Sequence, residues 1–385
     1  MENSGLTEDV SRAHGGPDNQ VWRGVSLMLD QYMHLNDQDR VLLLYARSAR
    51  EPAAWVAAEL DIRGIPAMLM DLEGLSAAAI KQSLSSAKFG LDQITDRLLV
   101  LCIEYDIVAP SDAIRDALEP FSGKRTEVFR TVMTGAEFFK QAVTTSPATL
   151  NNINAGLLHN LRSAEQFKVR TSSGSELDVV LDPARYRWVS NRGLHREGAF
   201  VLLPAGEVAT YPAQISGTLV ADGAFNSTAY TTLDARLQEH PAVFEIENGI
   251  MVDYQCDSPQ VKKLIERCLR LPNADRVGEL GFGTNIGIER FISLNSHLNE
   301  RFPSVHIGFG QSNQARGLVH SCDVHVDFIT SDCVIEIAGR PPLRSQDFKD
   351  LTGEHPAIEE GVFDEDLDGD CCGLFSPHNN IQCLT

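Results

Sequence analysis

Three short apolar runs near the start of the chain alternate with helical stretches, and this rhythm restricts the fold more than any other feature. The runs are RVLLLYA (40–46), PAMLMDL (66–72) and RLLVLCIEYD (97–106), separated by EPAAWVAAELDIRG and LSAAAIKQSLSSAKFG. Continuous apolar strands that alternate with helices are typical of a parallel sheet covered on both faces. The sequence therefore predicts an α/β domain with a parallel sheet.

The sequence pattern changes near residue 145, where strand-like segments joined by long polar connections begin. Examples are FKVRTSSGSELDVVLD (167–182), GAFVLLPAGEVATYP and ISGTLVADGAF. The predicted fold class is an N-terminal parallel-sheet α/β domain followed by a strand-rich α+β domain. We expect a flexible leader at 1–22, the α/β domain at 23–145, the α+β domain at 146–345, and an acidic, Cys-containing tail at 346–385.

The charge balance narrows the classes of partner. Among 385 residues, 33 Lys and Arg face 53 Asp and Glu, which gives a formal net charge of -20. This charge opposes binding to nucleic acid or to an anionic membrane, so we expect small molecules, cations or peptides as partners. An N-terminus without an apolar signal region and eight scattered cysteines suit a cytoplasmic protein with reduced thiols.

The segment HSCDVHVDF (320–328) places two histidines and two aspartates in nine residues. On a strand, His325 and Asp327 point to the same face, while Val326 and Phe328 point to the other. By itself this pair is either a two-ligand unit for a metal ion or a hydrogen-bonded pair on a surface strand.

Two upstream segments, GELGFGTNIG (278–287) and VHIGFGQSN (305–313), resemble one another. Alternation places Glu279 and His306 beside glycines on one strand face, with Leu280, Phe282, Ile307 and Phe309 on the buried face. Glycines next to a ligand leave room for a metal ion, water or substrate.

A further carboxylate, Glu207, follows the turn in LLPAGEVATYP at the edge of an apolar strand. It completes a set of three carboxylates and two imidazoles that suits two divalent ions and a bridging water. The predicted metal ligands are Glu207, Glu279, His306, His325 and Asp327. Such a centre favours metal-assisted hydrolysis.

PAGEVATYP, GELGFGTN, HIGFG and HSCDVHVDF together resemble segments of the aminopeptidase T and aminopeptidase S metallopeptidases. The resemblance covers residues 25 to 340 and implies a homodimer with two zinc, cobalt or manganese ions that cleaves an N-terminal peptide or amide bond. His320 resembles a polar position in the family that helps to move protons, so Glu279 and His320 are the expected catalytic residues. The expected substrate is a small peptide or an amino-acid derivative.

Two alternatives share this scaffold. Ring-cleaving dihydroxypyridine dioxygenases use one iron(II) held by two histidines and an aspartate, although Glu279 would be a histidine there. A biosynthetic-pathway relative with altered chemistry is the other alternative.

Substrate-binding candidates lie between the last ligand strands. Asn313 stands seven residues after His306, where the peptidases have a tyrosine, and this departure weakens the case for peptide hydrolysis more than for metal binding. Arg316, in the same loop, either holds a substrate carboxylate or covers the surface.

Overall fold

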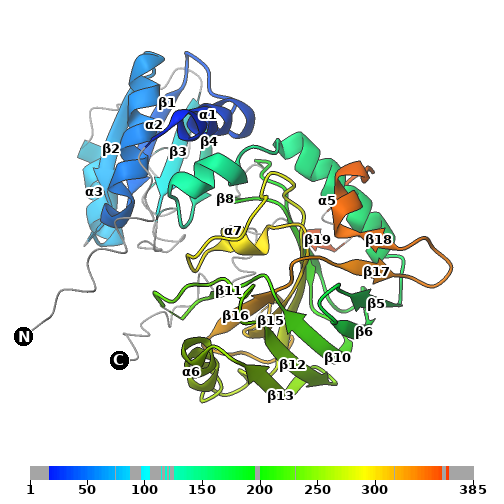
Figure 1. Cartoon of the computed structure of the whole chain (residues 1–385). Helices are drawn as coiled ribbons and strands as arrows, with labels where there is room; N and C mark the ends of the chain where they lie inside the picture. The colour runs from blue at the N-terminus through cyan, green and yellow to red at the C-terminus, as the bar shows by residue number, and fades with distance from the viewer. Residues whose placement is uncertain are drawn as a thin grey trace, which may run out of the picture. The chain divides into compact units, whose positions relative to one another are not determined.

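The computed structural model describes residues 17–73, 75–86, 97–104, 114, 118, 121, 125–195, 200–229, 231–315, 317–357 and 361–363. Residues 1–16 of the expected leader, and residues 358–360 and 364–385 of the expected tail, lie outside this description. The chain divides into two compact units (Figure 1). Unit 1 comprises Met1–Ser146 and His195–Leu203, and unit 2 comprises Pro147–Leu194 and Pro204–Thr385.

Unit 1 contains a parallel sheet whose described strands have the order β2-β1-β3-β4-β8. Its elements in chain order are α1 (Asn19–Leu27), the π-helical turn η1 (Met28–Tyr32), β1 (Arg40–Tyr45), η2 (Arg47–Ala49), α2 (Arg50–Ile62), β2 (Ala67–Asp71), α3 (Ala77–Ser86), β3 (Arg97–Ile103), β4 (Arg125–Thr131), η5 (Phe138–Ala142) and β8 (Phe200–Leu203).

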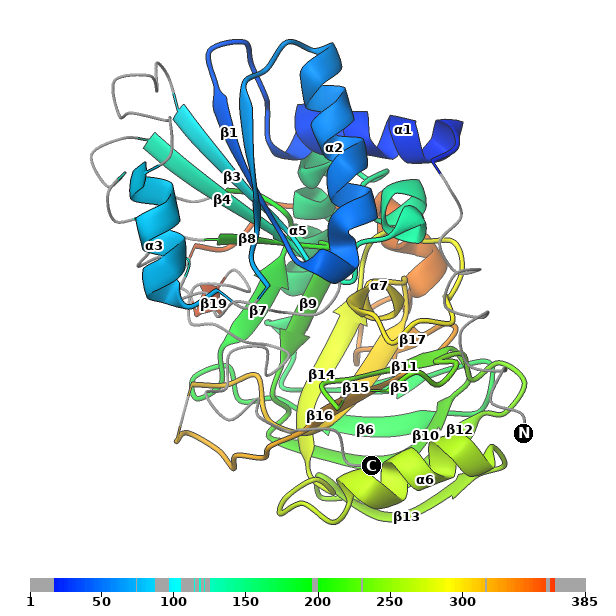
Figure 2. The ribbon, with the colours of Figure 1, turned by 90° about the vertical axis from the view of Figure 1, so that its left-hand side faces the viewer.

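The predicted parallel α/β sheet is confirmed. Strand β3 is buried along its whole length, as its continuous apolar sequence predicts for a strand between two helical layers. Helices α2 and α3 lie on opposite sides of the strands (Figure 2), because their right-handed crossovers run in opposite directions along the sheet. Among the described helices, none is both long and apolar enough to cross a bilayer.

Strand β8 comes from GAFVLLP, a segment expected among the strands of the α+β domain. In the structure it pairs in parallel with β4 of unit 1. Local periodicity identifies a strand but carries no information on which distant strand it pairs with.

A buried arginine joins several segments of unit 1. Arg97, at the start of β3, donates from Nε to Asp39 (2.9 Å), from Nη1 to Glu127 (2.8 Å) and from Nη2 to the Met33 carbonyl (2.7 Å). Its side chain is 4% exposed, whereas Arg125, which also pairs with Glu127, is 63% exposed. Glu127 therefore has one buried and one exposed cationic partner.

We expect Arg97→Met to lower the free energy of unfolding by about 3–5 kcal/mol, because it leaves buried Asp39 without its cation and Glu127 with only its exposed partner. The matched change Arg125→Met removes an exposed pair and should cost no more than about 1 kcal/mol. Urea denaturation followed by circular dichroism measures both. Equal losses in the two variants would contradict the importance of the buried pair.

Unit 2 is strand-rich, as predicted, and its described strands form two sheets. The first sheet has the order β13-β12-β10-β6-β5-β17-β18 and the second β11-β16-β15-β14-β9-β7-β19. Its elements in chain order are α5 (Pro147–Leu161), β5 (Gln166–Arg170), β6 (Glu176–Val180), β7 (Trp188–Asn191), β9 (Glu207–Thr210), β10 (Gln214–Ala221), β11 (Ala224–Ser227), β12 (Ala242–Glu247), β13 (Ile250–Cys256), α6 (Pro259–Cys268), β14 (Val277–Gly283), α7 (His297–Glu300), β15 (Val305–Gly310), β16 (His325–Ile329), β17 (Val334–Glu336), β18 (Leu343–Arg344), η6 (Ser345–Asp350) and β19 (Val362–Phe363).

One hydrophobic core joins the two sheets of unit 2. Phe244 of β12 lies 5.4 Å from Phe309 and 4.3 Å from Phe328, measured between ring centroids, and Phe167 lies 6.5 Å from Phe282. The alternating residues Leu280, Phe282, Ile307 and Phe309 all belong to this core, as the sequence predicts. The polar residues between them therefore point to the opposite face of the second sheet.

Candidate metal centre

The five predicted ligands come together on that opposite face. They lie on four adjacent strands of the second sheet: Glu207 on β9, Glu279 on β14, His306 on β15, and His325 and Asp327 on β16. None of their side chains is more than about 2% exposed. Side chains that share one face of their strands thus form one buried cluster when the strands pair.

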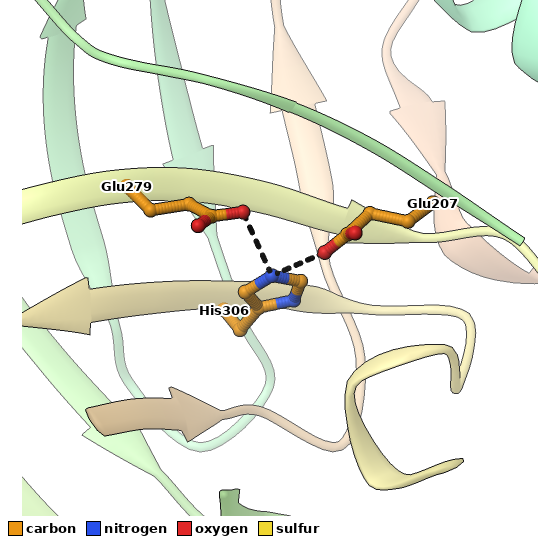
Figure 3. A group of neighbouring side chains, drawn as sticks. All are labelled: Glu207, Glu279 and His306. Atoms are coloured by element: carbon orange, nitrogen blue, oxygen red, sulfur yellow. Dashed lines mark ion pairs between the residues drawn. The ribbon is translucent and has the colours of Figure 1, made fainter. Parts of the chain in front are cut away.

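The first group of possible ligands consists of Glu207, Glu279 and His306. Both carboxylates extend toward the ring of His306 (Figure 3), with Nε2 2.9 Å from Glu207 Oε1 and 3.9 Å from Glu279 Oε1. A ligand atom from each of the three lies within 4.8 Å of the others.

The second group consists of Glu279, His325 and Asp327, which also meet within 4.8 Å. Nε2 of His325 lies 2.9 Å from Asp327 Oδ1 and 3.5 Å from Glu279 Oε2. Glu279 therefore belongs to both groups, with one carboxylate oxygen facing each imidazole.

Two glycines make room for the imidazole rings. Gly281 is opposite His306 in the β14–β15 pair, and a Cβ built on it would lie 2.0 Å from His306 Nε2. Gly308 is opposite both Glu279 and Asp327, and its Cβ would lie 2.5 Å from the His325 ring and 2.7 Å from Asp327 Oδ1. The sequence predicts space for a metal ion, water or substrate beside these glycines, whereas in the structure that space holds the imidazole rings and the Asp327 carboxylate.

The orientation of His325 suits a metal ligand. Its Nδ1 donates a hydrogen bond to the Gln311 carbonyl at 2.6 Å, which leaves Nε2 directed at the carboxylates. A backbone carbonyl at the distal ring nitrogen is the usual way in which proteins orient a metal-binding imidazole.

Burial changes the protonation of the centre. It raises the pKa of Glu279 to about 7, with the charges of Glu207 and Asp327 acting in the same direction. The pKa of His325 rises to about 10 because the neighbouring Asp327 and Glu279 outweigh the effect of burial, and that of His306 rises for the same reason beside Glu207 and Glu279. In the absence of a metal ion, protons on the imidazoles balance the carboxylates.

Further charged residues of the site, which the sequence patterns do not predict, come from SHLNER (296–301) between β14 and β15. Arg301 is fully buried, and its Nη1 lies 2.5 Å from Glu207 Oε2 and 3.1 Å from Glu300 Oε2. Glu300 also accepts a hydrogen bond from Asn226, which is opposite Asp327 on β11. The sequence signal that could have found them is the presence of three ionisable residues, His297, Glu300 and Arg301, in one short segment between two ligand strands.

His297 belongs to the same turn. It is 6% exposed, and neither ring nitrogen has a hydrogen-bond partner among the described residues. Burial, assisted by the charge of Arg301, lowers its pKa to about 3. His297 is therefore a neutral imidazole beside the charged cluster.

Asn154 of α5 holds the strand that carries Glu207. Its Nδ2 lies 2.9 Å from the Glu207 carbonyl and 3.1 Å from the Asn191 carbonyl, and its Oδ1 accepts from Thr284 at 2.6 Å. One amide thereby joins the helix to β7, β9 and the end of β14.

The remaining predicted site residues lie apart from this cluster or outside the description. His320 donates from Nε2 to the Gly310 carbonyl at 2.8 Å, and no hydrogen bond or ion pair among the described residues joins it to the five. Asn313 is buried, and its Oδ1 accepts from Gln314 at 2.7 Å. Arg316 lies outside the described residues. The roles assigned to these three residues stay predictions.

The residues present fit a divalent metal ion. Neither oxygen of Glu279 has a hydrogen-bond partner among the described residues, although the side chain is buried, and an unpaired buried carboxylate is costly. Carboxylate and imidazole donors suit zinc, manganese, cobalt or iron(II). The fixed orientation of the His325 ring supports the same conclusion.

Comparisons with known proteins agree with this scaffold. A family model described as crocagin biosynthetic protein CgnE/B matches residues 205–338, which contain all five candidate ligands. A search of curated proteins finds no match. A structure of 2,5-dihydroxypyridine dioxygenase from Pseudomonas putida KT2440 is similar with a TM-score of 0.53 and 15% identity, covering 90% of this chain and 100% of the other.

Wild-type AmpT from Thermus thermophilus is similar with a TM-score of 0.50 and 16% identity, covering 84% of this chain and 97% of the other. At such identities the likeness concerns the fold. The chain has the mixed α/β fold of these two proteins and carries residue groups that could hold a metal ion.

We expect Gly308→Ala to weaken Zn²⁺ binding by about 10–100-fold, the range found when groups that orient metal ligands are lost. The added methyl group would occupy the space of the His325 ring and of Asp327. Gly353→Ala is the control, because the nearest atoms to its new Cβ would be backbone atoms of Ala155 and Gly156, at 3.3 Å or more, and none belongs to a candidate ligand. Isothermal titration calorimetry measures both affinities, and equal affinities would contradict the packing argument.

Metal binding should release protons. Because the metal-free pKa of His325 is about 10, its Nε2 is protonated at pH 7 and must lose that proton to bind an ion. Apparent Zn²⁺ affinity should therefore rise with pH between about 6 and 9, up to about tenfold per pH unit for each proton displaced. Calorimetry in buffers of different ionisation enthalpy counts the protons, and a count of zero would contradict the protonation described.

Proposed function

We propose that this protein is a metal-dependent hydrolase that cleaves the N-terminal amide bond of a peptide or an amino-acid derivative. The observation that carries the proposal is Glu279, a buried carboxylate shared by two ligand groups. The likeness in fold to AmpT supports the choice of reaction, and a homodimeric assembly is part of the same proposal.

In this proposal Glu279, His325 and Asp327 hold an ion at one end of the cluster, while Glu207 and His306 lie at the other end. A divalent ion held there lowers the pKa of a water molecule and stabilises the oxyanion formed on attack. The geometry offers places for up to two ions.

The chain itself supplies the proton transfer. Glu279 accepts the proton of the attacking water at one carboxylate oxygen and returns it to the leaving nitrogen. Glu279 is placed for this task because its two oxygens face the two ligand groups and neither receives a hydrogen bond from the described residues. Neutral His297 adds no competing positive charge at pH 7.

The test is hydrolysis of a panel of amino-acid amides and short peptides by protein loaded with Zn²⁺, Co²⁺ or Mn²⁺. Glu279→Gln should lower kcat by about 10²–10⁴-fold, because it removes the proton acceptor. Glu245→Gln, a carboxylate change on the exposed side of β12, is the matched control and should leave the rate unchanged. If wild type, its chelated form and Glu279→Gln were equally inactive on every substrate, hydrolysis would be the wrong reaction.

A second candidate is an iron(II) ring-cleaving dioxygenase. It is favoured by the likeness in fold to the 2,5-dihydroxypyridine dioxygenase, and His306, His325 and Asp327 could supply two imidazoles and one carboxylate. Against it, His306 and Asp327 fall in different ligand groups, and Glu279 lies beside both imidazoles.

Loading with Fe²⁺ under anaerobic conditions separates the two reactions. Oxygen uptake in the presence of a dihydroxypyridine, together with absent amide hydrolysis, would support the dioxygenase and overturn the hydrolase. The match to a crocagin biosynthetic family also supports a third alternative, in which the protein performs altered chemistry in a biosynthetic pathway.

A further inference from the structure

The two ligand groups differ in one respect: a permanent cation lies against only one of them. Arg301 contacts Glu207 Oε2 through Nη1 at 2.5 Å, while Oε1 of the same carboxylate faces His306 at 2.9 Å. One oxygen of Glu207 therefore has a permanent cation as its partner, and the other lies at ion-pair distance from an imidazole. In the second group, Glu279 and Asp327 face the His325 imidazole, and no arginine or lysine ion pair to either is found in the described part of the chain.

Arg301 is held firmly in this position. Its Nε donates to the Pro204 carbonyl at 3.2 Å, and Nη1 lies 3.1 Å from Glu300 Oε2. The backbone around Arg301 packs directly against the end of β14. A Cβ on Gly283 would lie only 2.0 Å from the Phe302 carbonyl oxygen. A guanidinium so confined cannot swing out to water without moving the whole 300–302 segment.

A guanidinium stays charged at every physiological pH. In a site without solvent exposure it repels any second cation close to the same carboxylate, and the low local dielectric strengthens that repulsion. It also supplies the positive charge that Glu207 requires to remain ionised when buried.

We infer that Arg301 takes the place of one of two divalent ions, so that the centre binds a single exchangeable ion through Glu279, His325 and Asp327. This inference rests on the metal centre of the proposed function. Glu207, His306 and Arg301 then form a fixed group of paired charges at one side of the site. Arg301 is in this sense a positioning residue.

The number of bound ions tests the inference. Chelator-treated full-length protein is dialysed against buffered Zn²⁺, and bound zinc is counted by elemental analysis. Wild type should bind one Zn²⁺ per chain and Arg301→Met two, because removal of the guanidinium opens the Glu207 group to an ion. Arg130→Met, which removes another buried arginine paired with Glu104 in unit 1, should leave the count at one.

A second variant keeps the test decisive if Arg301→Met does not fold. Glu207→Gln can still accept a hydrogen bond from Arg301, and it should change the Zn²⁺ affinity by less than about threefold. Asp327→Asn alters a ligand of the exchangeable ion and should weaken binding by at least about tenfold.

The outcomes distinguish this inference from the proposed function. Two Zn²⁺ in wild type, one in Arg301→Met, or equal losses in Glu207→Gln and Asp327→Asn would each overturn the role of Arg301 while leaving a metal centre. No bound Zn²⁺ in wild type would instead overturn the metal centre and the proposed function with it.

Discussion

The centre of unit 2 depends on the burial of one carboxylate between two imidazoles. Glu279 faces His306 with one oxygen and His325 with the other, and neither oxygen receives a hydrogen bond from the described residues. A buried carboxyl group in that position must either take up a proton, which its raised pKa favours, or face positive charge on the imidazoles or on a metal ion. The adjacent glycines, the orientation of His325 and the protonation of the cluster all relate to this one requirement.

The sheet and the connection above it contribute in different ways. Strand pairing sets the spacing of the five ligands, because Glu279, Gly308 and Asp327 lie opposite one another across β14, β15 and β16. The connection from β14 to β15 adds charge, since it inserts Arg301 beside Glu207 and Glu300 beside Asn226. A rigid sheet thus provides the geometry, and the connection makes the two halves of the cluster unequal.

The likeness to a 2,5-dihydroxypyridine dioxygenase and to AmpT concerns the fold, and a fold does not by itself imply a function. The reaction must therefore be argued from side chains. The shared carboxylate is the basis of the proposed hydrolysis, and Arg301 is the basis of the inference that the centre binds one ion.

The parallel α/β sheet, the strand-rich second half and the strand face of the five candidate ligands can all be predicted from the sequence. These follow from periodicity, since i, i+2 residues of a strand share a face whatever the strand pairs with. Only the tertiary structure decided which strands are neighbours, that β8 joins the sheet of unit 1, and that His297, Glu300 and Arg301 enter the cluster. The physical reason is that pairing across long stretches of sequence, and the path of a connection over a sheet, depend on packing between distant residues, which local patterns do not record.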